Sequence, residues 1–375
     1  MLGAQGLRVG VPIEELQTRA RRDSNDAEAH YRLALGYWSK KRFDEAERAL
    51  REAVVIEPRF AEGWLALGYL PYARRRKLMD EERKGRVPAD WIAALDESYR
   101  LRRRAFLTKP LVDLQILGAV VPMQGAVLGL DPTSRRLTFA YNPFEAFVRG
   151  DYQYAYRELQ NMVQRSFSGR GRDSVPEPLL WYRGLAAAHV GWMDSAIADF
   201  AALLRRAERA ELVDSLVRIP LMTNDYRYVL ALLHQRARRW EAAIELYRKA
   251  LEYDVGLFMA HVQMGRIYEE RRMWDQAIAA FRLAAATNPD DHSLLLDLGV
   301  VLREAGQLAE AEHALRQAME GNPRDSRVPY HLGIVLQDSG NAAGARAALE
   351  RFLTLAPSRY ASQIVEAQRR LAELP

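Results

Sequence analysis

The sequence predicts an all-helical fold: a right-handed solenoid of about seven helix pairs, interrupted by an insert and ended by a C-terminal capping helix. Three observations predict it. Small residues and prolines recur with a fixed period, apolar residues within each period stand three and four positions apart, and a proline closes each period. A single helix pair cannot bury its apolar stripe, so successive pairs stack and share one continuous core.

The period is 34 residues, and three residue types keep it in phase through the C-terminal half. Glycine and alanine are expected where two antiparallel helices approach closely. Proline is expected after the second helix, because it cannot continue a helix. The residues that set the period are Gly265, Gly299 and Gly333; Ala277, Ala311 and Ala345; and Pro289, Pro323 and Pro357.

The unit at residues 258–291 shows how one period forms two helices. Val262 and Ile267 mark the apolar stripe of the first helix, and Ala277 and Phe281 mark that of the second. Asn288-Pro289-Asp290 then ends the second helix and begins the next unit, since aspartate caps helices well. Each period is therefore a helix-turn-helix unit.

This pattern resembles the tetratricopeptide repeat. Equivalent positions recur in residues 292–325 and 326–359, and an N-terminal unit is clear from His30 to Pro58. The resemblance covers roughly residues 26–358 and is weakest in the middle of the chain. In the unit at 258–291 the signature residues are His261, Met264, Gly265, Tyr268, Ala277, Phe281, Ala284 and Pro289.

The repeat phase also predicts the organisation of the chain. The last segment is an amphipathic helix that would cover the final exposed core face. The predicted segments are an N-terminal extension (1–25), N-terminal repeats (26–70), an insert interrupting a repeat (71–142), degenerate repeats (143–223), regular repeats (224–358) and the capping helix (359–375).

The insert begins with a basic segment. Between Pro71 and Pro110, twelve lysines and arginines face six acidic residues, which accounts for the net charge of +5 of the whole chain. Such a patch can bind nucleic acid or an anionic membrane, but no aromatic interleaving accompanies it, which favours a solvated helical surface. The candidate basic patch is Arg74, Arg75, Arg76, Lys77, Arg102, Arg103 and Arg104.

The rest of the insert is apolar. Leu114–Leu130 lacks charge, but it is short, and glycines and Pro122 interrupt it, which disfavours a membrane span. We expect a helix ending near Val121, with a hairpin over residues 126–141 as one continuation.

No pattern in the sequence predicts catalysis. The seven histidines are scattered without ligand-like spacing, and nucleophile, phosphate-loop and zinc motifs are missing. The acidic pairs Glu269-Glu270 and Asp290-Asp291 fit ordinary helix faces and caps. With no cysteine, thiolate sites and disulfides are excluded. We therefore expect no enzyme, no cofactor and no metal.

The resemblance implies a binding groove lined by the first helices of successive units. Carrying the family's groove positions onto this chain selects a face rich in aromatic residues, which dominate binding energy at interfaces. The predicted groove residues are Tyr31, Trp38, Tyr69, Trp181, Tyr228, Val262, Arg266, Leu296, Arg303, Tyr330 and Ile334.

The leading function is therefore a non-enzymatic scaffold that holds a protein or peptide partner in this groove. Self-assembly into a homo-oligomer or filament is one alternative, because solenoid ends can stack. Binding of nucleic acid or a membrane surface through residues 74–109 is the other. The N-terminus fits a cytoplasmic protein, or a periplasmic or extracellular one if Gly3-Ala4-Gln5 is the remnant of a signal peptide.

Overall fold

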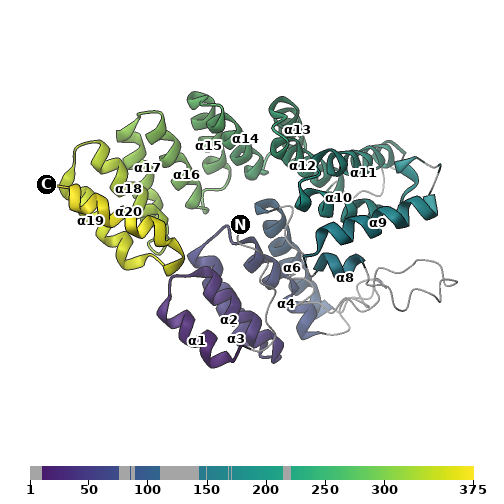
Figure 1. The fold of residues 1–375 in the computed structure, drawn as a ribbon, viewed down its shortest axis with the longest axis horizontal. Coiled ribbons are helices and arrows are strands. Elements are labelled where there is room, and N and C mark those ends of the chain that lie inside the picture. The colour runs from purple at the N-terminus through teal and green to yellow at the C-terminus, as the bar shows by residue number, and fades with distance from the viewer. Residues whose placement is uncertain are drawn as a thin grey trace. The chain divides into compact units, whose positions relative to one another are not determined.

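The structure is a computed structural model of the 375-residue chain, shown in Figure 1. It describes residues 11–75, 85, 89–109, 143–148, 150–167, 169, 171–213 and 221–375. All regular structure in this part of the chain is helical, and none of it is strand. The predicted all-helical solenoid of stacked helix pairs is confirmed.

The chain divides into two compact units. The first, built around residues 110–255, is called the middle unit. Its described helices are α8 (Pro143–Val148), α9 (Tyr152–Phe167), the 3₁₀ helix η1 (Arg172–Ser174), α10 (Glu177–Val190), α11 (Met193–Val213), α12 (Leu221–Arg236) and α13 (Trp240–Tyr253).

The second unit joins residues 9–109 to residues 256–375 and is called the terminal unit, because it contains the repeats near both ends of the chain. Its described helices are α1 (Ile13–Arg22), α2 (Ala27–Ser39), α3 (Phe43–Ile56), α4 (Ala61–Arg74), α6 (Ala89–Thr108), α14 (Phe258–Glu270), α15 (Trp274–Thr287), α16 (Ser293–Glu304), α17 (Leu308–Gly321), α18 (Arg327–Asp338), α19 (Ala342–Leu355), the 3₁₀ helix η2 (Ser358–Tyr360) and α20 (Ala361–Glu373).

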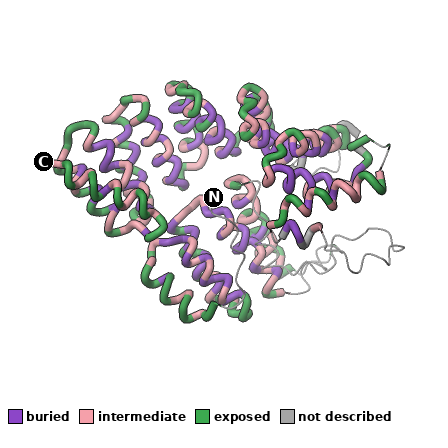
Figure 2. The backbone as a smooth tube through the Cα atoms, viewed as in Figure 1, coloured by how far each residue is buried: buried purple, intermediate pink, exposed green. Residues whose placement is uncertain are grey.

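Consecutive helices pack as pairs, and the small residues predicted to set the period lie at the contacts. A Cβ added at Gly265 would come within 2.9 Å of the Phe281 ring, and one at Gly333 within 2.7 Å of the Leu349 side chain. Ala277 is fully buried in the same pair as Gly265. Figure 2 shows the buried residues on the sides that helices turn toward their neighbours. The repeat pattern therefore reports helix contacts directly.

The predicted insert contains a helix of the repeat that it interrupts. Helix α6 packs along α4, and the Ser98 hydroxyl donates a hydrogen bond of 2.5 Å to the Gly68 carbonyl. Helix α4 also continues past Pro71 to Arg74. Helix α6 is therefore the second helix of the pair that α4 begins, and inserted residues separate the two helices in the sequence. The expected helix ending near Val121, the hairpin over 126–141 and the segment Leu114–Leu130 lie outside the described residues.

In the terminal unit one additional helix packs on the first helix pair of the chain and another packs on the last pair. Ala367 of α20 is buried against Leu349 and Phe352, as expected for the capping helix. Helix α1, which the sequence analysis did not predict, covers α2, and Gln17 donates a hydrogen bond of 2.7 Å to the Tyr37 hydroxyl. Caps of this kind shield a solenoid core from water.

No helix in the described part of the chain is both long enough and apolar enough to cross a membrane.

Candidate functional site

The predicted groove residues belong to the first helices of their pairs but are divided between the two units. Trp181 on α10 and Tyr228 on α12 lie in the middle unit. The terminal unit holds the other predicted residues: Tyr31 and Trp38 on α2, Tyr69 on α4, Val262 and Arg266 on α14, Leu296 and Arg303 on α16, and Tyr330 and Ile334 on α18.

Most of the apolar members of this set are buried. The Tyr31 ring meets Phe60 edge-on at 5.2 Å, and the Trp38 ring meets Phe43 in the same way at 5.8 Å. Side chains packed in this way stabilise the repeats, and their contact with a partner stays a prediction. The buried members are Tyr31, Trp38, Tyr228, Val262, Leu296 and Ile334.

The remaining members are more accessible. Arg266 is exposed, whereas Tyr69, Trp181 and Tyr330 are half-buried. Arg303 forms ion pairs with Asp338 at 2.6 Å and with Glu304 at 2.9 Å. The predicted groove therefore presents more charge than aromatic surface in the C-terminal repeats.

Helices α14, α16 and α18 form what is called here the first-helix face, which carries titratable groups in a partly buried setting. Burial raises the pKa of Glu269, and repulsion from the Asp297 carboxylate adds to this shift. Burial lowers the pKa of His331 to about 4, and the nearby cations Arg327 and Arg303 act in the same direction. Shifts of this kind mark positions where a charge is poorly solvated.

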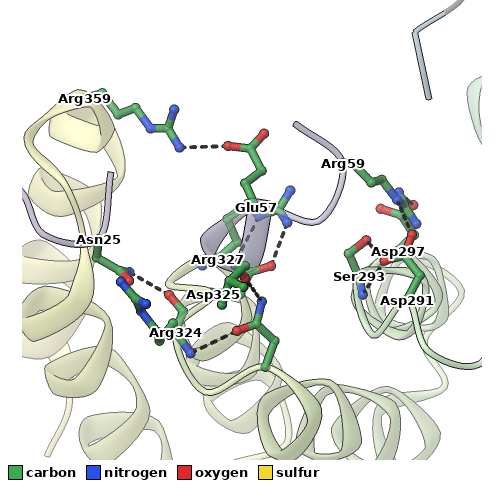
Figure 3. A network of polar contacts seen from close by, with 12 residues as sticks. Asn25, Glu57, Arg59, Asp291, Ser293, Asp297, Arg324, Asp325, Arg327 and Arg359 are labelled. Atoms are coloured by element: carbon green, nitrogen blue, oxygen red, sulfur yellow. Dashed lines mark hydrogen bonds and ion pairs between the residues drawn. The ribbon is translucent and has the colours of Figure 1, made fainter. Parts of the chain in front are cut away.

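An ion-pair contact joins the N-terminal repeats to this face within the terminal unit (Figure 3). Arg59, in the turn between α3 and α4, reaches Asp297 of α16 at 2.5 Å and Asp291 at 3.4 Å. Burial would lower the pKa of Arg59, but the carboxylates of Asp297 and Asp291 outweigh that effect and raise it. Residues more than 230 positions apart therefore form one buried charge cluster.

A second set of contacts lies between inter-repeat turns. Asn25 donates hydrogen bonds to the backbone carbonyls of Arg324 at 2.6 Å and Leu355 at 3.1 Å. Arg324 in turn reaches Glu52 at 2.8 Å. The turns that precede α2 and α18 therefore contact each other, and they also reach the end of α19 and the side of α3.

Arg359 completes this junction between the turns. Its guanidinium pairs with Glu57 at 2.9 Å and with Asp26 at 3.3 Å. Asp26 also accepts a hydrogen bond from the Glu28 amide and so caps α2. We use the name turn junction for the contacts of Arg59, Asn25, Arg324 and Arg359 described above.

Sequence reasoning missed the turn junction. Asp290-Asp291 was expected to be an ordinary cap, and Asp291 does accept a hydrogen bond from the Ser293 amide at 3.2 Å. The additional partner Arg59 lies in a distant repeat. One available signal was the arginine that follows the repeat proline in Pro58-Arg59 and Pro323-Arg324.

The described cations of the candidate basic patch are largely engaged within the chain. Arg74 pairs with Asp44 at 2.6 Å and Glu47 at 2.8 Å. Arg75 stacks over Trp91, Arg102 over Tyr69 and Tyr72, and Arg104 over Trp64. Arg103 also takes part in an interaction. Arg76 and Lys77 lie outside the described residues. These cations therefore contact neighbouring side chains, including aromatic rings, whereas the sequence favoured a solvated surface without aromatic neighbours. Binding of nucleic acid or a membrane through this patch stays a prediction.

The described residues include no cluster of three or more His, Asp or Glu side chains that could hold a metal ion.

The stacked helix pairs define a helical-repeat protein. Models of the tetratricopeptide repeat family match residues 27–60, 228–292, 262–326 and 302–367. In these segments the chain is therefore a tetratricopeptide repeat protein. Proteins built from this repeat are in general non-enzymatic scaffolds for protein–protein interaction, and the matches support the same general role for this chain.

Solved structures with a similar architecture include the C-terminal part of a TPR repeat-containing protein from Cytophaga hutchinsonii. It has a TM-score of 0.49 and 13% identity, over 62% of this chain and 86% of that one. MamA has a TM-score of 0.39 and 18% identity, over 48% and 90%. YrrB, described as a TPR protein with an unusual peptide-binding site, has a TM-score of 0.39 and 14% identity, over 57% and 99%. No curated protein sequence gives a significant match.

Proposed function

We propose that this chain is a non-enzymatic scaffold that binds a segment of a partner protein along the first-helix face of its C-terminal repeats. The observation that carries this proposal is the accessible charge on that face. Arg266 is exposed, and Glu269 and Arg303 are half-buried, while neighbouring apolar positions such as Leu296 serve the core. A partner would therefore be recognised mainly through ion pairs and hydrogen bonds.

This mode differs from the aromatic recognition expected from the sequence. Charged groups at a partly desolvated surface give orientation and selectivity, because a wrongly placed charge is left without a partner. The raised pKa of Glu269 supports a poorly solvated surface of this kind.

Site-specific photo-crosslinking tests the proposal. A benzoylphenylalanine placed at Arg266 reports on the first-helix face, and the same group at Arg316, exposed on the second helix α17, serves as the matched control. We expect a crosslinked partner from position 266 in cells of the native organism, and none from position 316. Equal crosslinking at both positions, or crosslinking only at 316, would refute the proposed face.

A further inference from the structure

We propose that the carboxylates of Asp291 and Asp297 form a binding subsite for an arginine side chain. In this structure Arg59 of the same chain fills it. An arginine-bearing segment of a partner protein fills it when the Arg59 side chain is displaced. The inference deepens the function proposed above, since it names the chemistry that the first-helix face selects.

The subsite is built from two carboxylates held in different ways. The Ser293 hydroxyl donates to Asp291 Oδ1 at 2.5 Å and the Ser293 amide donates to the same oxygen at 3.2 Å. Oδ2 of Asp291 is thereby left for the guanidinium, whose Nε lies 3.4 Å away. Asp297 lies one turn into α16, and its carboxylate accepts a hydrogen bond from Nη1 of the same guanidinium, as Figure 3 shows.

This arrangement suits arginine better than lysine. A guanidinium is planar and presents donors in several fixed directions, so it can serve two carboxylates at once. A lysine ammonium is a compact, strongly hydrated charge and loses more hydration on entering a partly buried site. Asp291 is fully buried, so the subsite penalises a ligand that keeps its water shell.

The following repeat shows why this subsite accepts an outside residue. Asp325 stands 34 positions after Asp291, and Arg327 stands 34 positions after Ser293. Arg327 binds the Asp325 carboxylate through two nitrogens, at 2.9 and 2.6 Å. That repeat therefore supplies its own guanidinium. In the preceding repeat Ser293 stands in place of this arginine, so the Asp291 carboxylate pairs with a guanidinium from elsewhere in the chain, that of Arg59.

Arg59 is an imperfect occupant. Its Nη2 is buried and has no hydrogen-bond partner among the described residues. An additional carboxylate, Glu269, lies close enough to Asp297 to be repelled by it. Arg104, on α6, attracts Asp291 from the side of the N-terminal repeats without forming an ion pair among the described contacts. A partner arginine that also used the Glu269 carboxylate would compete well with Arg59.

One of the contacts of the turn junction is open to competition. Arg324 and Glu52, which bridge the same two segments, are both substantially exposed, and exposed pairs contribute little stability. The Glu57–Phe60 turn is itself held to the repeat, because Phe60 is buried and its ring packs edge-on against Tyr31 of α2. Exchange of the occupant therefore means that the Arg59 side chain leaves the two carboxylates while the packing of the turn is kept.

Peptide complementation in the full-length chain tests the subsite. The variant Arg59→Ala vacates it, and the probe is a fluorescein-labelled peptide of residues 56–62, sequence IEPRFAE. Control peptides carry lysine or alanine in place of the arginine. We expect fluorescence anisotropy to show at least tenfold tighter binding of the arginine peptide by Arg59→Ala than by the wild type. The same variant should prefer the arginine peptide over both controls by a similar factor.

A second substitution locates the binding. Adding Asp297→Asn to Arg59→Ala should abolish the preference for arginine. If circular dichroism shows that Arg59→Ala has lost helix, Arg59→Gln takes its place. Equal binding of the three peptides, or no binding at all, would overturn the proposal. So would a concentration-dependent dimer of the wild type that Arg59→Ala and Asp297→Asn each abolish, since the occupant would then be a second copy of this chain.

Because this assay uses no natural partner, its result is independent of the crosslinking experiment. Crosslinking at position 266 without arginine-selective binding would leave the scaffold proposal standing and remove only the subsite.

Discussion

Gly299 of α16 lies directly against Leu315 of α17: a Cβ added to the glycine would stand 2.6 Å from the leucine Cγ. Ala311, one turn earlier on α17, is fully buried beside the same contact. The two helices approach this closely because Gly299 and Ala311 carry no larger side chain. This close contact requires a small residue at the same position of each repeat, which is why the period is visible in the sequence.

We predict that Ala311→Leu destabilises the protein by about 1–3 kcal/mol, because added volume at a tight helix contact forces side chains out of their preferred rotamers. Urea unfolding followed by circular dichroism measures the change. Ala309→Leu is the matched control, since Ala309 is exposed on the same helix. A similar loss of stability in both variants would contradict the proposed packing.

The helix pairs could be predicted because their packing is repeated. Gly265, Gly299 and Gly333 meet the same constraint, so each reinforces the signal of the others. The turn junction could not be predicted in this way. Arg59 and Asp297 occur once each in their roles, and their separation of 238 positions follows from no local pattern. Only the three-dimensional arrangement of the terminal unit brings them together.

The predicted groove shows a second limit of sequence reasoning. Tyr31, Val262 and Leu296 occupy the fifth position of their units, which the family resemblance assigned to the groove. All three are buried. A shift of one position rotates a helical side chain by roughly 100°, because an α-helix has about 3.6 residues per turn. A family position therefore identifies the helix more securely than the direction of the side chain.

Trp38 tests whether such a residue serves the core. Its side chain is 7% exposed and its ring packs edge-on against Phe43. We predict that Trp38→Ala lowers the free energy of unfolding by about 3–5 kcal/mol, as expected when a large buried aromatic leaves a cavity. Equilibrium urea unfolding again supplies the measurement.

Trp192→Ala is the control for this substitution, because Trp192 is 39% exposed and contacts Tyr156 from the surface. Its truncation should cost clearly less than that of Trp38. If Trp38→Ala instead left stability unchanged, Trp38 would be free to serve a partner, as the groove prediction supposed.

The pairing of Arg59 with Asp297 predicts a measurable coupling. The two side chains are 11% and 25% exposed, so water screens their attraction only partly. In a double-mutant cycle of Arg59→Ala and Asp297→Ala, we expect a coupling free energy of about 1–3 kcal/mol. Denaturant unfolding of the four full-length proteins gives the value.

The cycle of Arg324→Ala and Glu52→Ala is the internal comparison. Both of these side chains are largely solvated, so their coupling should stay below about 1 kcal/mol. A coupling for Arg59 and Asp297 no larger than this would show that the buried pair does not hold the turn junction together.

His331 predicts how stability depends on pH. Burial together with Arg327 and Arg303 lowers its pKa to about 4 in the folded protein, against about 6.5 in the unfolded chain. Between these values the unfolded state binds more protons, so His331 makes the free energy of unfolding fall as the pH decreases from about 6.5 to 4. The full effect is at most roughly 3.5 kcal/mol, because the pKa difference is about 2.5 units and each unit corresponds to about 1.4 kcal/mol.

The substitution His331→Asn isolates this contribution, because asparagine keeps a polar side chain that does not titrate. The free energy of unfolding is measured by urea at pH 7, 6, 5 and 4.5 for both proteins. Burial also lowers the pKa values of His234 and His261, but these remain in both proteins and cancel in the difference. The wild type should lose stability more steeply than the variant below pH 6.5. Parallel curves would mean that His331 accepts a proton as readily in the folded chain as in the unfolded one, and would place it in solvent instead of within the charged first-helix face.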